Sequence, residues 1–421
     1  MIAVVGGGIT GLALGWELGR RGADFRVLEA RSEPGGVIRS AEVEGRMLDW
    51  GPQRARLTAG VRSLVEALGL SDQVVEAPGD LDLFVYRAGR LRKVPFSARA
   101  FLASDIVSPW AKLRLALEPF TAGADPQERV ADFFTRKVGR EVYETVVAPL
   151  YGGLYGSDPA DMRVGLSLIH VLREFGVRRS LTLPLLRRGG RVDPPPACTF
   201  KDGMQALPRA LADRLGARLR LSSPVRGLRR DGEGWAVELA DGVVHARAVV
   251  LTTPAPVTSA LLREVAPEAS AAVARLRYNP LAVVHLDADT GLRGLGFQVA
   301  FTESALALRG VTFNDSLFGR RNLYTAYLGG ARHPEVVEMD DAGLAARAVE
   351  EFRICTGHGA RALAVERERM PAWDVSWSAL ADVRLPAGLH VAANWWSRPG
   401  LPGRLTEAGR MAGLLAGSGA G

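Results

Sequence analysis

Three glycines near the start of the chain have the spacing of a nucleotide-binding turn. Gly6, Gly8 and Gly11 follow the apolar run Ile2–Val5 and open a stretch, 10–21, whose apolar residues recur with a helical period. At such a strand-to-helix joint the first glycine permits the tight turn, the second lets a diphosphate approach the backbone, and the third lets the helix pack on the strand. The helix N-terminus adds N–H donors and partial positive charge. The alternative is a tight turn without a ligand.

An acidic residue and a second glycine pair extend this pattern. Glu29 ends a second predicted strand, Phe25–Leu28, about 20 residues after the glycines, where a carboxylate can hold ribose hydroxyls. Gly35 and Gly36 follow, and they indicate a second close approach of backbone to the ligand. The pattern resembles the FAD-binding superfamily of amine oxidases, carotenoid desaturases and porphyrinogen oxidases. FAD, bound non-covalently, is therefore favoured over NAD.

The strand and helix signals predict an α/β plus α+β fold. Buried strands at Ala248–Leu251 and 389–393, and helices at 204–215 and 405–415, would join the N-terminal strands in one parallel sheet. We expect a discontinuous Rossmann-like FAD-binding domain, an antiparallel-sheet substrate domain, and a helical insertion, which the resemblance associates with membrane surfaces. Their predicted bounds are 1–55, 196–262 and 376–421 for the first, 56–95 and 263–375 for the second, and 96–195 for the third.

Further segments narrow the resemblance to the oxygen-dependent protoporphyrinogen oxidase family, which includes coproporphyrinogen-oxidising members. The resemblance covers nearly the whole chain, although the N-terminal glycines are common to the entire superfamily. The more specific segments are 90–95, 100–106, 153–158, 179–181, 199–203 and 278–285.

This resemblance implies which residues contact the cofactor. Val225 matches a residue whose backbone meets the adenine, and Asn394 precedes a C-terminal turn beside the flavin ring. Each has a simpler alternative, since Val225 could be a core residue and Gly400 the entry to a helix. The full predicted set is Gly6, Gly8, Ile9, Thr10, Gly11, Glu29, Ala30, Arg31, Gly35, Gly36, Gly51, Pro52, Val225, Thr253, Asn394, Gly400, Leu401 and Pro402.

The implied reaction dehydrogenates protoporphyrinogen IX or coproporphyrinogen III to the porphyrin, in haem biosynthesis. A ring carbon gives a hydride to flavin N5, a pyrrole proton leaves, and dioxygen reoxidises the flavin. Because the flavin carries the difficult step, no catalytic side chain is expected. The six histidines are scattered without ligand spacing, so no metal is expected either.

The predicted substrate contacts depart from the family pattern. Members often carry an arginine before an aromatic-aliphatic-tyrosine triplet, where it can meet a substrate propionate, but here Leu83 precedes Phe84-Val85-Tyr86. We expect Arg54, Arg56 and Gly153 to contact the substrate instead. Arg54 is the candidate for a propionate, and a solvated surface arginine is the alternative.

Three other functions remain open from the sequence. An amine oxidase of this fold usually has a lysine in its substrate domain, and no lysine follows Lys201. A carotenoid-type desaturase fits the Pro- and Gly-rich turn 398–403 but fits the middle of the chain poorly. A flavin- or porphyrin-binding homologue without turnover is compatible with Leu83.

Composition limits the classes of partner and the cellular compartment that we expect. The chain has 421 residues, a formal net charge of +7 and only two cysteines, too few for a disulfide framework. No basic module for nucleic acid and no transmembrane run stands out, so we expect a cytoplasmic protein, peripheral at the inner membrane face at most, with an enzyme of haem synthesis as a further partner. A basic tract would meet anionic lipid or form a solvated helix face; its members are Arg173, Arg178, Arg179, Arg187, Arg188 and Arg191.

Overall fold

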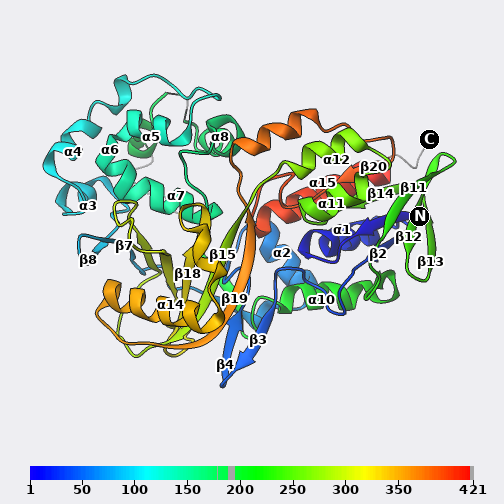
Figure 1. The fold of residues 1–421 in the computed structure, drawn as a ribbon, viewed down its shortest axis with the longest axis horizontal. Helices are drawn as coiled ribbons and strands as arrows, with labels where there is room; N and C mark the ends of the chain where they lie inside the picture. The colour runs from blue at the N-terminus through cyan, green and yellow to red at the C-terminus, as the bar shows by residue number, and fades with distance from the viewer. Residues whose placement is uncertain (178, 188–194, 418–421) are drawn as a thin grey trace. The chain divides into compact units, whose positions relative to one another are not determined.

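The computed structural model describes residues 1–177, 179–187 and 195–417. Their contacts divide the chain into two compact units (Figure 1). The first unit contains Met1–Glu76, Pro195–Leu276 and Ala379–Gly421, and the second contains Ala77–Pro194 and Arg277–Ser378. The division into three domains stays a prediction. Residues 56–76 and 263–276 were predicted as parts of the substrate domain, but the structure places them with the first unit. Of the predicted basic tract, Arg178, Arg188 and Arg191 lie outside the described residues.

A five-stranded parallel sheet forms the centre of the first unit, with the strand order β10-β2-β1-β14-β20. In this register Ile2 lies between Phe25 and Ala248. All four residues of β1 and of β14 are buried, as expected for parallel strands that are covered on both faces. The strands are β1 (Ile2–Val5), β2 (Phe25–Leu28), β10 (Leu219–Arg220), β14 (Ala248–Leu251) and β20 (Leu389–Val391).

Two layers cover this sheet. One face packs through a shared apolar cluster against α1 (Ile9–Arg20), α2 (Ala59–Leu68), α10 (Ala206–Leu215) and α15 (Leu401–Gly417). The other face contacts the antiparallel meander of β11 (Gly227–Asp231), β12 (Gly234–Leu239) and β13 (Gly242–Ala246). The unit also contains α11 (Ala255–Leu262), α12 (Pro267–Ala274), the hairpin β3 (Ser40–Val43) and β4 (Arg46–Asp49), and the small sheet of β5 (Ala55–Arg56), β9 (Ala197–Phe200) and β6 (Val74–Glu76).

The second unit is built on a seven-stranded sheet. Its strand order is β19-β15-β18-β17-β16-β7-β8, and helix α14 (Asp341–Thr356) packs on one face (Figure 1). All neighbours are antiparallel except β16 and β7, which are parallel, so the expected antiparallel sheet is mixed at this pair. The strands are β7 (Leu83–Arg87), β8 (Arg90–Lys93), β15 (Tyr278–Asp287), β16 (Gly296–Val299), β17 (Leu308–Phe313), β18 (Leu323–Gly329) and β19 (Arg361–Pro371).

Short helices make up most of the stretch 98–187, as the sequence predicts. They join the sheet through a second apolar cluster that includes Val85, Ala148 and Ala300. The helices are α3 (Ala98–Ala103), α4 (Pro109–Leu115), α5 (Val130–Val138), α6 (Arg140–Val142), α7 (Ala148–Tyr155), α8 (Ile169–Glu174) and α9 (Thr182–Arg187), and α13 (Asn314–Phe318) follows β17.

The predicted strands of the first unit form where expected, whereas one helix begins earlier than predicted. The helix expected from Leu405 begins at Leu401, so Leu401 and Pro402 belong to its first turn. Proline fits a first helical turn because its missing N–H would have no intrahelical partner there.

Candidate functional site

The glycine turn joins β1 to α1 with no room for side chains. Gly6 has φ +109°, in the region that favours glycine. A Cβ on Gly11 would stand 1.9 Å from the carbonyl oxygen of Gly6, and a Cβ on Gly7 would stand 2.8 Å from the Cβ of Glu29. Gly8 is the N-cap residue of α1, and no side chain caps this helix, so its first N–H groups remain available to a ligand.

Glu29 lies against this turn. The side chain is buried, and its Oε2 accepts a hydrogen bond from the Gly7 amide, while Oε1 accepts one from the Arg31 amide at 2.8 Å. These two bonds fix the carboxylate at the carboxyl end of β2, and ligands bind at that end of the strands in open parallel sheets.

The second glycine pair packs directly on the first turn. The Gly35 amide donates to the carbonyl of Gly7 at 2.9 Å, and Gly8 and Gly35 form an isolated parallel bridge. A Cβ on Gly36 would stand 3.2 Å from the Cα of Gly8. The two glycine segments therefore form one compact backbone surface. Gly51 belongs to the same region, because its Cβ would stand 2.0 Å from the carbonyl oxygen of Val37.

The segment after β10 reaches the same place. The amide of Ser222 donates to the carbonyl of Arg31, and the amide of Ser223 donates to the carbonyl of Glu29. Val225, two residues further on, is half-buried. The structure thus brings the region of the predicted adenine contact beside the predicted ribose contact.

A threonine that sequence reasoning did not identify braces the turn. The Oγ1 of Thr252 lies 2.9 Å from the carbonyl oxygen of Val5 and 3.0 Å from that of Gly6. Thr253, the predicted contact, accepts a hydrogen bond at its carbonyl from Trp395 Nε1. The only sequence signal for Thr252 was its place directly after a buried strand.

The C-terminal segment is held by a buried arginine. The guanidinium of Arg404 donates to the carbonyls of Ala393 and Arg398 and to Ser397 Oγ, and burial lowers the pKa of Arg404 to about 10. These bonds connect the first turn of α15 to the loop that contains Asn394, while Gly400 with φ +82° precedes the helix.

The remaining predicted residues are distributed over both units. Ile9 and Thr10 open α1, whereas Ala30, Arg31 and Pro52 are exposed in the first unit. Of the predicted substrate contacts, Arg54 is half-buried, Arg56 is exposed and donates to the carbonyl of Pro195, and Gly153 is exposed on α7 of the second unit. Their roles stay predictions.

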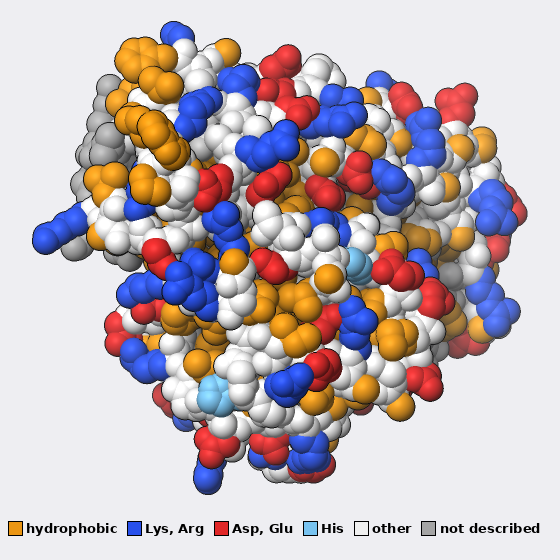
Figure 2. Space-filling model, turned by 60° about the vertical axis from the view of Figure 1, so that its left-hand side comes forward, with side chains coloured by type: hydrophobic (Ala, Val, Ile, Leu, Met, Phe, Trp, Pro, Cys, Tyr) orange, Lys and Arg blue, Asp and Glu red, His pale blue; other side chains and the backbone are white. Residues whose placement is uncertain are grey.

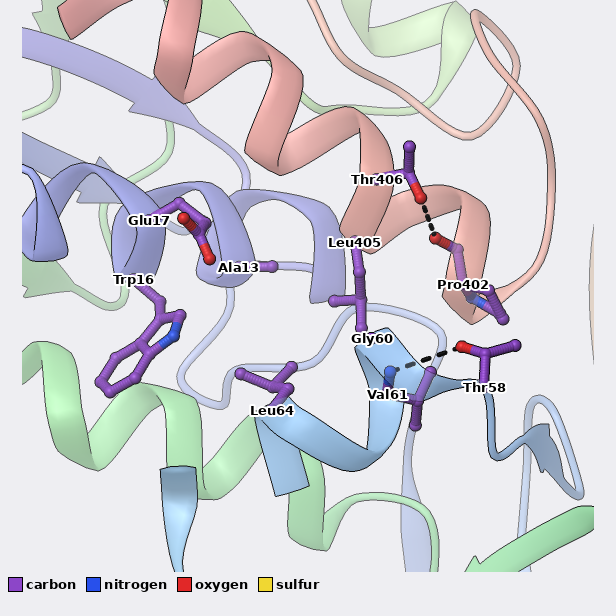
Figure 3. Close-up of a pocket in the computed structure, with 10 residues that line it drawn as sticks. All are labelled: Ala13, Trp16, Glu17, Thr58, Gly60, Val61, Leu64, Pro402, Leu405 and Thr406. Carbon is purple, nitrogen blue, oxygen red and sulfur yellow. Dashed lines mark hydrogen bonds between the residues drawn. The ribbon is translucent and has the colours of Figure 1, made fainter. Parts of the chain in front are cut away.

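A separate cavity of about 280 Å³ lies between α1, α2 and α15 (Figure 3). Its lining is mainly apolar, and its one ionisable residue, Glu17, pairs with Arg20 and Arg21. Pro402 is the only predicted cofactor residue that lines it. The cavity is therefore not the place where the predicted cofactor residues gather.

Other chemistry finds little support in the described residues. They contain no group of acidic, histidine or cysteine side chains that could hold a metal, and no helix among them is long and apolar enough to cross a bilayer. Both cysteines are buried, and burial raises the pKa of Cys198 to about 11 and raises that of Cys355 as well. Neither thiol is activated as a nucleophile.

Comparison with known proteins gives the same fold and family. The family described as flavin containing amine oxidoreductase matches residues 9–403. Protoporphyrinogen oxidase of Oryza sativa subsp. japonica chloroplasts is 29% identical over 384 residues, covering 81% of this chain and 72% of the relative. Protoporphyrinogen oxidase of Homo sapiens is 29% identical over 371 residues, covering 78% and 77%.

Solved structures agree over almost the full length. A structure from Exiguobacterium sp. 255-15 has a TM-score of 0.83 at 20% identity, covering 99% of this chain and 98% of that one. Cyclohexylamine oxidase from Brevibacterium oxydans IH-35A has a TM-score of 0.71 at 17% identity, with the same coverage. At these identities the likeness establishes the fold.

The residues around the glycine turn fit FAD, which is the cofactor of this chain. Any side chain at Gly7 or Gly11 would collide with Glu29 or with the Gly6 carbonyl, so the turn keeps its backbone open to a diphosphate. The free N-terminus of α1 suits the phosphates, and the buried Glu29 carboxylate suits ribose hydroxyls.

Proposed function

The chain belongs to the family of flavin-containing amine oxidoreductases, and from this premise we propose that it oxidises a carboxylate-bearing porphyrinogen to the porphyrin with dioxygen as the acceptor. It is an FAD-dependent oxidoreductase. The alignment with the rice and human protoporphyrinogen oxidases carries the choice of substrate, because it spans 81% and 78% of this chain. Protoporphyrinogen IX and coproporphyrinogen III are the two candidate substrates.

FAD, when bound, supplies an acceptor for two electrons per cycle, so the side chains need only bind and orient. The first turn of α1 and Glu29 hold the nucleotide part of FAD in this proposal. The N-terminus of α15, fixed by Arg404, offers N–H groups and partial positive charge to the flavin end. Arg54, Arg56 and Gly153 are proposed substrate contacts.

Anaerobic mixing tests the proposal. Purified holoenzyme is mixed with protoporphyrinogen IX, coproporphyrinogen III, a polyamine or a carotenoid precursor, and the visible flavin absorbance is followed. We expect bleaching by at least one porphyrinogen, and recovery of the absorbance with formation of peroxide when oxygen is admitted. Bleaching by the polyamine or the carotenoid precursor alone would assign another oxidoreductase activity, and bleaching by none would indicate a binding protein.

A peripheral membrane contact is a second part of the proposal, and exposed apolar side chains support it. Trp110 is 79% exposed, Phe120 78%, Leu102 67% and Leu113 62%. All four lie between α3 and the short 3₁₀ turn Glu118–Phe120, a stretch that also contains basic residues such as Lys112. Orange and blue side chains gather together at the upper left of Figure 2. Exposed aromatic and leucine side chains beside lysine and arginine are typical of surfaces that lie in a lipid interface.

We place the protein in the cytoplasm, at the inner membrane face, where an enzyme of haem synthesis would exchange substrate with it.

A further inference from the structure

A half-buried cation without an ion-pair partner among the described residues lies in the second unit. Arg309 is half-buried in β17, near the middle of the seven-stranded sheet. It has no hydrogen bond and no ion pair within the described part of the chain; its guanidinium carbon lies 4.9 Å from the ring centre of Phe301. Burial, and secondly the charge of Arg332, lower the pKa of Arg309 to about 10, and the smaller effect of the Asp158 charge opposes this shift.

A β-bulge turns Arg309 to the face opposite α14. Leu308, Val311 and Phe313 all pack in the apolar cluster that contains α14. The register between β17 and β18 shifts after Leu308, so that Leu308 lies opposite Leu328 and Gly310 opposite Tyr327. In a regular strand, successive side chains point to opposite faces of the sheet. The bulge interrupts this alternation, so Arg309 and Gly310 both lie on the face opposite α14.

Two more polar side chains are neighbours of Arg309 on that face. Gln298 lies opposite Gly310 in the register of β16 and β17, and its side chain occupies the space above both Gly310 and Gly153. Its amide, like the Arg309 guanidinium, has no hydrogen-bond partner among the described residues. Arg332 lies over the same Phe301 ring at 4.3 Å and donates to the Phe301 carbonyl at 3.0 Å.

The charge balance of this group calls for one anion. Arg332 already has Asp158 nearby, with 3.9 Å between Nε and Oδ2, so one of the two positive charges is compensated within the chain. A half-buried guanidinium without a partner costs free energy, which a bound anion would recover. A carboxylate fits best, because it carries a single charge and matches the planar fork of arginine, and the Phe301 ring suits the apolar part of the molecule that carries it.

We propose that Arg309, with Gln298 and Arg332 beside it, binds a carboxylate of the substrate. This inference rests on the proposed function, in which the carboxylate is a propionate of the porphyrinogen. Arg309 would also supply a positive charge in place of the arginine that family members often carry where this chain has Leu83. Leu83 lies on β7, two strands from β17 in the same sheet, and packs in the same apolar cluster as Phe301.

The test compares a diacid with its ester. Holoenzyme is titrated with protoporphyrin IX and with its dimethyl ester in the same detergent, and KM and kcat are measured with protoporphyrinogen IX. For Arg309→Leu we expect the diacid affinity to fall, and KM to rise, by about 10- to 100-fold, because losing a charge-assisted hydrogen bond weakens binding by about this factor. The ester affinity and kcat should change little. Arg309→Lys keeps the charge without the fork and should show an intermediate loss; it also serves if the leucine variant does not fold.

Arg321→Leu is the matched control, since Arg321 is exposed in the turn before β18 and should leave both affinities unchanged. Flavin content and melting temperature confirm that each variant is folded. Equal affinity of Arg309→Leu and the wild type for the diacid would overturn the anchor, as would an equal loss for diacid and ester. If the wild type oxidises no porphyrinogen, the proposed function fails, while a diacid preference that depends on Arg309 would still establish the carboxylate site.

Discussion

At the scale of single residues, the Glu29 carboxylate is fixed by two backbone hydrogen bonds and still has acceptor positions for a ligand. Each of its oxygens accepts one backbone N–H, from Gly7 and from Arg31. A carboxylate has about four lone-pair directions, so two remain for hydroxyl donors. Glu29 is therefore both part of the fold of the turn and a proposed contact of the FAD ribose.

Glu29→Gln should weaken FAD binding by about 10- to 100-fold, with a smaller loss of stability. The amide keeps one acceptor oxygen, but its NH₂ group would face one of the two backbone donors and could not accept from them. Quenching of flavin fluorescence on titration of the apoprotein measures the affinity. Glu42→Gln is the control, since Glu42 is exposed on β3. An unchanged FAD affinity for Glu29→Gln would remove Glu29 from the site.

Local spacing is what made the geometry of the glycine turn predictable. Gly6, Gly8, Gly11 and Glu29 belong to one strand-helix-strand unit, in which the sequence fixes the neighbours. Thr252 reaches the turn through pairing of strands that are far apart in the sequence, so no local pattern identified it. Arg309 depends on a bulge, and a shift of one residue in register is invisible in an alternating apolar pattern.

At the scale of elements, a buried ion pair fixes the segment 179–182 in the helical part of the second unit. Glu118 and Lys137 are 0% and 1% exposed, with 3.1 Å between Oε1 and Nζ. Glu118 also accepts from the Ser180 hydroxyl, from the Leu181 amide and from Thr182, and Lys137 donates to the carbonyl of Arg179. Burial acts to raise the pKa of Glu118, but the hydrogen bonds outweigh it and lower the pKa to about 2.

Stability should therefore depend on pH through Glu118. Its folded pKa lies below its unfolded value of about 4.5, so the stabilising contribution is complete above that pH and is lost as the pH falls toward 2. The full contribution is on the order of 3 kcal/mol. In thermal unfolding, Glu118→Gln should melt below the wild type at neutral pH, and the difference should shrink between about pH 4.5 and pH 2. Glu128→Gln is the comparison variant from the same region, because Glu128 forms a partly buried ion pair with Arg136. A difference between Glu118→Gln and the wild type that stays constant with pH would contradict the assignment.

Element types were easier to predict than element ends and pairing directions. Helix α14 spans Asp341–Thr356, and local signals mark both of its ends: Asp340 caps its N-terminus and Gly357 is in a left-handed conformation at its C-terminus. The start of α15 was missed because Pro402 was read as part of a turn. The parallel pairing of β16 with β7 was missed because the two strands lie more than 200 residues apart, and nothing local marks their direction.

At the scale of the whole molecule, apolar exposure is concentrated in one stretch of the chain. Among the side chains that the structure describes, nine of the exposed large apolar ones lie between residues 96 and 183, whereas those elsewhere, such as Val257 and Met339, are far apart in sequence. Scattered apolar residues are normal on a protein surface, but a concentration of them indicates contact with another surface. The sequence indicated a helical insertion here, but the exposure of these side chains became apparent only from the packing.

Replacing the two most exposed aromatic residues should separate membrane binding from catalysis. Trp110→Ser with Phe120→Ser removes the side chains that are 79% and 78% exposed, so the folded state loses little packing. Transferring such side chains into a lipid interface is favourable in proportion to their apolar area, and we expect sedimentation with anionic phospholipid vesicles to fall at least about 10-fold. Porphyrinogen oxidation in detergent should be unchanged, because neither residue is a proposed contact of FAD or substrate.

Val257→Ser, at an exposed apolar site of the first unit, is the control and should sediment like the wild type. If the double variant also sediments like the wild type, the surface around α4 does not face lipid; if the wild type sediments no more with anionic than with neutral vesicles, the basic residues contribute nothing to the contact and only apolar insertion remains.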